Sequence, residues 1–303
     1  MMSSRKNIIG RFAPSPTGPL HFGSLVAAVG SYCLARQPGG SWLLRMEDID
    51  TPRVVPGAAD ALLSELEAFG FAWDGEVLFQ STRFDRYDDV LGQLRDKGLL
   101  FDCGCTRKEI LASAPHPGEE GPRYPGTCRQ GLPPGRHPRS QRLRVPDNLF
   151  CFTDAVFGGV EQHLADAVGD FILKRADGLF AYQLAVVVDD IDYRVNQVVR
   201  GADLISSTAR QIHLYACLDE TPPHYVHLPI ALGEDGEKLS KRHGNFGLDR
   251  ADRSATLVRV LRFLGQDTPA DLRRESTADI LQWAVENFDI NTVSRLPDRP
   301  DRV

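Results

Sequence analysis

Residues 11–24 read RFAPSPTGPLHFGS, and the predicted fold follows from this stretch. The apolar residues directly before and within its start predict a buried strand, which the prolines and glycines then end. An apolar run that begins at Ser24 predicts a helix. His21 and Gly23 therefore fall at a helix N-terminus, where unpaired N–H groups and the helix dipole attract phosphate oxygens. The stretch predicts an ATP-binding corner, although a plain tight turn with an exposed histidine has the same pattern.

A second segment, at residues 238–242, reads KLSKR and lies among glycines and acidic residues. That composition favours a basic loop over a helix or strand. A solvated run of charges is the commoner meaning of such a cluster. The pairing of this loop with the histidine-glycine corner makes the functional interpretation the stronger one.

Together the two segments resemble the HIGH and KMSKS elements of class I aminoacyl-tRNA synthetases. Ser24 replaces the second histidine of HIGH, and Arg242 replaces the final serine of KMSKS. Residues 43–51, 186–190 and 199–203 are similar to glutamyl-tRNA synthetases in the same order. The similarity ends near Gly247, where the full-length enzymes continue into an anticodon-binding region.

Two departures resemble the family of glutamyl-queuosine tRNA(Asp) synthetases, which are short paralogues of glutamyl-tRNA synthetases. One is the early end of the similarity, and the other is GADL at residues 201–204 in place of GEDH. The resemblance implies ATP-dependent, tRNA-independent activation of L-glutamate and its transfer to the queuosine base at the wobble position of tRNA(Asp). The alternatives are a truncated glutamyl-tRNA synthetase that charges the tRNA 3′ end, a small-molecule adenylyltransferase and a catalytically silent RNA-binding paralogue.

The expected amino-acid pocket follows from the charges of glutamate. Two carboxylates and one ammonium require guanidinium or backbone donors and at least one protein carboxylate. The resemblance implies that this pocket is formed by Arg11, Phe12, Ala13, Pro14, Ser15, Glu47, Tyr182 and Arg200. The resemblance also implies that Glu47 binds the ammonium group of glutamate. Each residue also has an ordinary interpretation: Glu47 in a solvated acidic turn, Arg200 paired with Asp203, and Tyr182 in the core.

The resemblance also implies the residues that act on ATP. His21, Lys238 and Lys241 are expected to be catalytic, and His21, Gly23 and Lys241 are expected to bind the nucleotide. Their task is to align the reactants and to stabilise developing negative charge. Mg²⁺ is expected to arrive with the phosphates of ATP, since no dedicated protein cage is visible.

A possible metal site lies in a segment rich in proline and glycine. Cys103, Cys105 and Cys128 place three thiols in one short region, which favours zinc over buried reduced thiols. Residue types alone offer His116 or His137 as a fourth ligand. The resemblance favours Tyr124 instead, because Cys-x-Cys followed by Tyr-x-x-x-Cys is the zinc pattern of that family. The other three cysteines, Cys33, Cys151 and Cys217, are expected to fill the core.

Composition limits the partners and the location. The chain has 303 residues with 35 Lys and Arg against 41 Asp and Glu, a net charge of −6. No global basic field exists, so any contact with RNA must be local. No apolar run reaches the roughly 20 residues of a membrane span, and the first ten residues do not resemble a signal peptide. We therefore expect a cytoplasmic monomer that binds no membrane.

The alternation of apolar strands with amphipathic helices predicts an α/β fold with a doubly wound parallel sheet. The resemblance makes this sheet Rossmann-like and splits it by the zinc-bearing insertion. The expected division is a first catalytic half at 1–98, the insertion at 99–165, a second catalytic half at 166–248 with the KMSKS-like loop, and a helical segment at 249–303. Residues 291–303 are expected to form a frayed end.

Overall fold

The computed structural model describes residues 7–113, 122–232 and 248–300. The helices are α1 Phe22–Arg36, α2 Ala58–Ala68, α3 Phe84–Asp96, α4 Arg107–Ser113, α5 Leu164–Ala167, α6 Tyr182–Asp192, α7 Ile205–Cys217, α8 Arg253–Phe263 and α9 Thr277–Asn287. The strands are β1 Ile9–Phe12, β2 Ser41–Met46, β3 Leu78–Phe79, β4 Leu100–Cys103, β5 Ser140–Leu143, β6 Leu149–Asp154, β7 Gly158–His163, β8 Phe171–Lys174, β9 Gln197–Gly201, β10 His224–Leu228, β11 Ile230–Leu232 and β12 Asp298–Pro300.

The central sheet has seven strands in the order β3-β2-β1-β9-β10-β6-β7. All of its neighbouring pairs are parallel except the β6–β7 hairpin, which is antiparallel. This confirms the predicted α/β class with a mostly parallel sheet. The chain runs outward from β1 through β2 to β3, and β9 and β10 extend the sheet on the other side of β1. The strand order therefore reverses between β1 and β9, where open α/β sheets bind ligands beyond the carboxyl ends of their strands.

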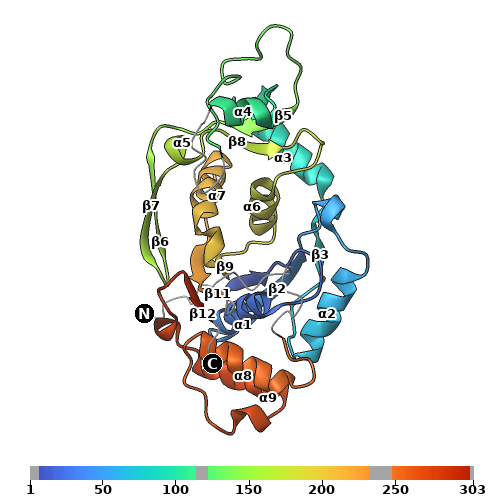
Figure 1. Cartoon of the computed structure of the whole chain (residues 1–303), viewed down its shortest axis with the longest axis vertical. Helices are drawn as coiled ribbons and strands as arrows, with labels where there is room; N and C mark the ends of the chain where they lie inside the picture. Colours follow the sequence, from blue (N-terminus) through green and yellow to red (C-terminus); the bar gives the residue numbers. More distant parts are fainter. Residues whose placement is uncertain (1–6, 114–121, 233–247, 301–303) are drawn as a thin grey trace.

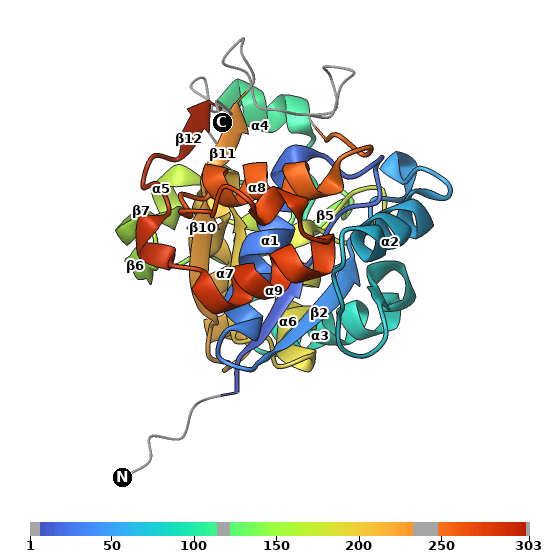
Figure 2. The ribbon, with the colours of Figure 1, turned by 90° about the horizontal axis from the view of Figure 1, so that it is seen from below.

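Helices cover both faces of this sheet. On one face, α1 packs against β1 and β9, and α8 and α9 pack over α1 (Figure 2). Apolar side chains of α1, such as Leu25 and Val29, share one core with Leu257 of α8 and Ile280 of α9. On the other face, α6 and α7 lie side by side (Figure 1). The helical spacing predicted after residue 249 is therefore explained by a layer that buries α1.

A separate antiparallel sheet of β4, β5 and β8 lies beside α3, α4 and the ends of α6 and α7 (Figure 1). The strand pairing crosses the predicted insertion boundary at residue 165. β6 and β7 fall within 99–165 but join the central sheet, whereas β8 follows residue 165 but pairs with β5. The division into domains stays a prediction, and the two sheets are built from interleaved segments.

Two smaller expectations were wrong. Cys33 and Cys217 are buried as expected, but Cys151 is exposed. It lies on β6, whose alternating exposure turns every second side chain to solvent, a pattern that its apolar neighbours conceal. The end of the chain is also ordered further than expected, because β12 pairs in parallel with β11. The hydrogen bonds of that pair involve backbone groups, so the polar sequence of β12 gave no signal. Of the helices described, none is long and apolar enough to span a membrane.

Candidate active site

The cavity at the carboxyl ends of β1 and β9 has a volume of about 470 Å³. It gathers every predicted amino-acid and nucleotide residue that lies within the described ranges: Arg11, Phe12, Ala13, Pro14, Ser15, His21, Gly23, Glu47, Tyr182 and Arg200. These residues come from segments up to 189 positions apart in the numbering of the chain (from 11 to 200). Lys238 and Lys241 lie outside the described residues.

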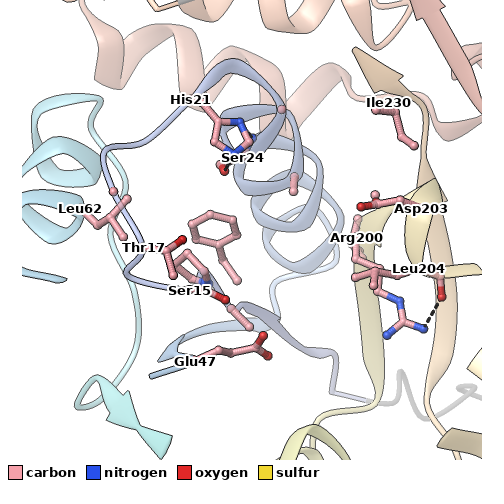
Figure 3. A pocket seen from close by; sticks show the side chains of 18 of the residues that line it. Ser15, Thr17, His21, Ser24, Glu47, Leu62, Arg200, Asp203, Leu204 and Ile230 are labelled. Carbon is pink, nitrogen blue, oxygen red and sulfur yellow. Dashed lines mark hydrogen bonds between the residues drawn. The ribbon is translucent and has the colours of Figure 1, made fainter. Parts of the chain in front are cut away.

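His21 forms one end of the cavity, and Glu47 lies toward the opposite end (Figure 3). His21 is the N-cap of α1, with extended backbone angles, and its Nδ1 accepts a hydrogen bond from Ser24 N at 3.2 Å. A neutral ring that accepts at Nδ1 carries its proton on Nε2, which then donates to Ser24 Oγ at 2.9 Å. The serine that replaces the second histidine thus orients the first. Helix α1 points its N-terminus at the cavity, as the sequence predicts.

Glu47 is a buried carboxylate at the end of β2, with a side chain 11% exposed. Burial raises its pKa, and the charges of Arg45 and Arg11 only partly oppose that shift. Arg45 Nη2 donates to Glu47 Oε1 at 3.3 Å. The carboxylate is therefore short of positive charge, and an ammonium ion in the cavity would stabilise its ionised form.

Arg45 connects Glu47 to a buried ion-pair network that no prediction included. Its Nη1 donates to Asp190 Oδ1 at 2.6 Å, and its Nε lies 3.9 Å from Asp189 Oδ2. Asp190 Oδ1 is also 3.5 Å from Arg11 Nε. The guanidinium of Arg45 thus sits between carboxylates from β2 and from α6, and the network fixes where Arg11 and Glu47 lie.

Asp189 anchors the far side of the same network. Its side chain is fully buried and accepts hydrogen bonds from Gln80 Nε2 at 2.7 Å, Arg83 Nε at 2.7 Å and Tyr87 OH at 3.0 Å. Burial raises its pKa despite these partners. The signal for this network was present in the sequence: two consecutive acids end the apolar run of residues 184–188, where a solvated charge would not be expected.

Arg200 is held by groups on four sides. Nε donates to His227 Nε2 at 3.0 Å, Nη1 donates to Gln211 Oε1 at 2.8 Å, and Nη2 donates to Thr208 Oγ1 at 2.8 Å and to Leu204 O at 3.2 Å. A longer contact of 3.5 Å joins Nη1 to Tyr182 OH. Among the described residues, every group that accepts a hydrogen bond from Arg200 is uncharged. Its positive charge is therefore not cancelled by a directly bonded carboxylate.

His227 is hydrogen-bonded to both Asp154 and Arg200 and so connects these two side chains. Its Nδ1 donates to Asp154 Oδ2 at 2.7 Å, and both side chains are fully buried. Burial lowers the pKa of His227, so the ring stays neutral and Nε2 stays free to accept from Arg200. For Asp154, burial opposes ionisation, but hydrogen bonds from His227 and from the backbone of residues 156 and 157 bring its pKa below the usual value.

Arg11 and Arg200 differ in the donors that they have left. Arg200 has partners for all three of its nitrogens, whereas Arg11 donates from Nη1 to Val199 O at 3.2 Å, and its buried Nε, although 3.5 Å from Asp190 Oδ1, makes no hydrogen bond with the described residues. A buried donor without a partner costs free energy until a ligand satisfies it. Arg11 therefore differs from Arg200 in having a buried donor that no hydrogen bond satisfies.

The three predicted thiols form one cluster. The Sγ atoms of Cys103, Cys105 and Cys128 all lie within 4.8 Å of one another. Cys105 Sγ and Cys128 Sγ are 3.7 Å apart, close to the sulfur separation of about 3.8 Å in a tetrahedral site with Zn–S bonds of about 2.3 Å. The separation is too long for a disulfide. The donor set therefore fits a metal ion.

Tyr124 completes the cluster. Its hydroxyl lies 3.5 Å from Cys103 Sγ and accepts a hydrogen bond from Cys128 N at 2.8 Å. His137 is exposed and is not part of the thiol cluster, and His116 lies outside the described residues. Among the described candidates, the geometry favours Tyr124 as the fourth ligand.

The thiols of the cluster differ in how easily they ionise. Burial and the neighbouring thiols raise the pKa of Cys105 to about 11. For Cys103, burial also opposes ionisation, but hydrogen bonding to Tyr124 and the nearby Arg142 bring its pKa down to about 7. A bound metal ion would favour the ionised form of the thiols that hold it.

Similarity to known proteins agrees with this geometry. The family model for the catalytic domain of tRNA synthetases class I (E and Q) matches residues 7–274. A curated relative from Dechloromonas aromatica (strain RCB), named glutamyl-Q tRNA(Asp) synthetase, is 58% identical over 289 residues, covering 94% of this chain and 95% of the relative. A second protein of that name, from Geobacter sulfurreducens, is 54% identical over 294 residues, and the match covers 94% of this chain and 93% of that relative.

A solved structure places the fold in the same family. The glutamate-tRNA synthetase from Elizabethkingia anophelis superposes with a TM-score of 0.78 at 28% sequence identity, covering 96% of this chain and 67% of that one. The chain belongs to the class I tRNA synthetase family (E and Q), among the glutamyl-Q tRNA(Asp) synthetases.

Proposed function

We propose that this protein activates L-glutamate with ATP, without needing tRNA, and transfers the glutamate to the queuosine base at the wobble position of tRNA(Asp). The observation that carries the proposal is the composition of the 470 Å³ cavity. It joins Glu47, a carboxylate whose pKa stays raised despite its pairing with Arg45, to the guanidinium of Arg11, which has a donor without a hydrogen bond, and to the N-terminus of α1. An amino acid with an acidic side chain and a nucleotide phosphate match these three features.

In this proposal the amino acid lies between β1, β2 and β9. Glu47 binds the ammonium, Arg11 binds one carboxylate, and Arg200 with Tyr182 provides positive charge and hydrogen bonds on the opposite wall. The backbone of residues 12–15 forms the floor. The name that the two relatives share, glutamyl-Q tRNA(Asp) synthetase, supports glutamate as the amino acid.

The first reaction joins the α-carboxylate of glutamate to ATP. A carboxylate oxygen attacks the α-phosphorus, the bond from that phosphorus to the bridging oxygen breaks, and pyrophosphate leaves with the electron pair. His21, Gly23 and the first N–H groups of α1 hold the phosphates. We assign Lys241, assisted by Lys238, to the negative charge that develops on the leaving group. Mg²⁺ enters with ATP.

The second reaction transfers the glutamyl group. A hydroxyl of the queuosine cyclopentenediol attacks the carbonyl carbon of the adenylate, AMP leaves, and the hydroxyl proton is lost. The chemistry equals that of a ribose diol at a tRNA 3′ end, so the same catalytic cavity can serve either acceptor. The name shared by the two relatives supports the queuosine base.

Zinc is proposed as a structural metal held by Cys103, Cys105, Tyr124 and Cys128. Four protein ligands leave no position for a reacting water. The region has a small core of its own, in which three of six buried residues are these cysteines. A bound ion would therefore stabilise a segment that cannot bury enough apolar surface by itself.

The test maps the position of transferred glutamate. The protein is incubated with ATP, labelled glutamate and tRNA(Asp) with or without queuosine, and the labelled tRNA is cut by nucleases. We expect label on the anticodon fragment only when queuosine is present. Label on the terminal adenosine, or equal labelling of tRNA without queuosine, would favour a truncated glutamyl-tRNA synthetase and sink the assignment.

A further inference from the structure

A second cavity, of about 850 Å³, lies between the β4-β5-β8 sheet and the helices α6 and α7. We call it the arginine cavity, because five arginines line it: Arg107, Arg139, Arg142, Arg175 and Arg210. They come from α4, β5 and the residue before it, the turn after β8, and α7, which meet near one end of the molecule (Figure 1). Of these side chains, Arg142 also lies beside Cys103 and Tyr124 of the thiol cluster, and none of the five lines the catalytic cavity.

The acidic residues of the arginine cavity are already engaged. Asp170 forms an ion pair with Arg129 and accepts a hydrogen bond from Val145 N at 2.8 Å. Asp177 forms an ion pair with Arg175 at 2.7 Å. Neither carboxylate therefore neutralises the remaining arginines of the wall.

Three of those arginines keep donors for a ligand. Arg107 and Arg139 are exposed, and neither has an ion pair with any residue in the described ranges. Arg142 is 6% exposed; its Nη1 donates to Asp170 O at 2.8 Å and its guanidinium lies over the Tyr124 ring, but its buried Nε has no hydrogen-bond partner there. A protein with a net charge of −6 has concentrated guanidinium groups in one hollow, and Arg107 and Arg139 there have no ion pair with the described residues, which is the local basic surface that an RNA contact needs.

The arginine cavity adjoins the catalytic cavity of about 470 Å³ at the carboxyl ends of β1 and β9, which we call the glutamate cavity from here on. Tyr182, at the start of α6, lines both. On the other side, Arg139 and Arg175 also line a smaller hollow of about 200 Å³ that includes Lys174. Basic side chains thus line hollows that extend from a residue of the amino-acid site to the β4-β5-β8 sheet, although Lys174 and Arg175 are paired with Asp88 and Asp177.

We propose that the arginine cavity binds the sugar-phosphate backbone of the acceptor RNA next to the nucleotide that enters the glutamate cavity. The inference rests on the proposed function for its choice of RNA. Guanidinium groups bind phosphate oxygens through two hydrogen bonds at once, and such contacts position a nucleic acid without reading its sequence. Arg107 and Arg139 hold phosphates at the mouth, and Arg142 provides charge at the base of the hollow.

The experiment compares two double variants of the full-length protein. Arg107→Gln with Arg139→Gln removes two charges from the arginine cavity. Arg273→Gln with Arg274→Gln removes two exposed charges between α8 and α9, at the opposite end of the molecule (Figure 1). Fluorescence anisotropy measures the Kd of a labelled anticodon stem-loop of tRNA(Asp) at several salt concentrations. Glutamate-dependent ATP–pyrophosphate exchange without RNA reports on the glutamate cavity.

We expect the arginine-cavity variant to bind the RNA about 10-fold more weakly than the native protein. The slope of log Kd against log salt should become shallower by roughly 0.7 for each phosphate that the variant no longer neutralises. Exchange without RNA should be unchanged, and the control variant should match the native protein in both assays.

Three results would overturn the proposal: unchanged RNA affinity and salt slope, an equal loss in the control variant, or a higher KM for ATP with unchanged RNA affinity. The last result would indicate that these arginines contribute to the binding of ATP and not of RNA. Failure of the proposed function has a different signature, since the native protein would then show no glutamate-dependent exchange while its RNA affinity could still be measured.

Discussion

The glutamate cavity and the thiol cluster of Cys103, Cys105 and Cys128, also called the cysteine cluster below, are organised in opposite ways. The cavity draws its charges from residues far apart in sequence, such as Arg45 and Asp190, which are joined at 2.6 Å. The cysteine cluster draws its donors from residues 103–128 and has a core of only six buried residues. In the cavity, opposite charges of the protein form ion pairs with one another, whereas the cluster brings together donor atoms of the kind that bind a metal ion.

This difference separates two kinds of stability. A buried ion-pair network holds its geometry without a ligand, so the amino-acid site is formed before substrate arrives. A cluster of thiols has no such internal compensation, and a metal ion bound by it would add to its stability in proportion to the logarithm of the metal concentration. Substitutions in the two regions should therefore respond differently to added ligands.

The largest effect is expected from Asp190→Asn. Removing one partner of a buried ion pair leaves the other charge uncompensated and costs about 3–5 kcal/mol of unfolding free energy. Asp88→Asn is the matched control, since Asp88, which pairs with Lys174 at 2.6 Å, has an exposed side chain, and this pair should contribute less than about 1 kcal/mol. Denaturant unfolding of both variants gives the comparison. Equal losses would show that the network is no stronger than a surface pair.

Glu47→Gln should lower glutamate-dependent exchange by about 100-fold, because the substrate ammonium loses its buried counter-ion. The stability of the folded protein, in contrast, should not decrease in this variant. Burial raises the pKa of Glu47 in the folded protein, so the stability that its protonated form provides is lost as the pH rises through that pKa. The neutral amide avoids this penalty.

We therefore expect a thermal midpoint at neutral pH that is equal to or higher than that of the native protein. Glu76→Gln, at an exposed position, serves as the control for a change of net charge. Full exchange activity in Glu47→Gln would rule out the ammonium contact, and a large loss of stability would contradict the assigned cost of burial.

Tyr124→Phe should weaken zinc binding by about 10-fold while leaving the fold intact, because only the hydroxyl oxygen is removed. His137→Ala should bind zinc like the native protein, since that side chain is exposed and outside the cluster. Titration with a competing chelator measures both affinities. Loss of zinc in His137→Ala with retention in Tyr124→Phe would transfer the ligand to the histidine.

The smallest effect concerns acid stability. Burial lowers the pKa of His227, so the stability that this neutral ring provides is present above the unfolded pKa of about 6.5 and is lost as the pH falls. His227→Gln should make the free energy of unfolding less dependent on pH just below that value. The exposed His224 lies on the same strand, and His224→Gln should leave the pH dependence unchanged. Identical pH profiles for both variants and the native protein would contradict the role given to the ring.

The sequence predicted the parts of the site that carry local patterns. The histidine-glycine corner follows from prolines and glycines between a strand and a helix, and His21 caps α1 as expected. The thiols were visible from their spacing. The pairing of Arg45 with Asp190 and of His227 with Asp154 was not predicted, because it depends on which strands and helices become neighbours. No short window of sequence contains that information.

The most direct test of the preformed amino-acid site is ATP–pyrophosphate exchange by the native protein without any RNA, with glutamate, glutamine and aspartate offered separately. Glutamine lacks the side-chain charge, and aspartate is one methylene shorter. We expect exchange with glutamate alone. Exchange that appears only after tRNA is added, or that is equally fast with glutamine, would contradict a cavity whose buried charges are placed for glutamate in advance.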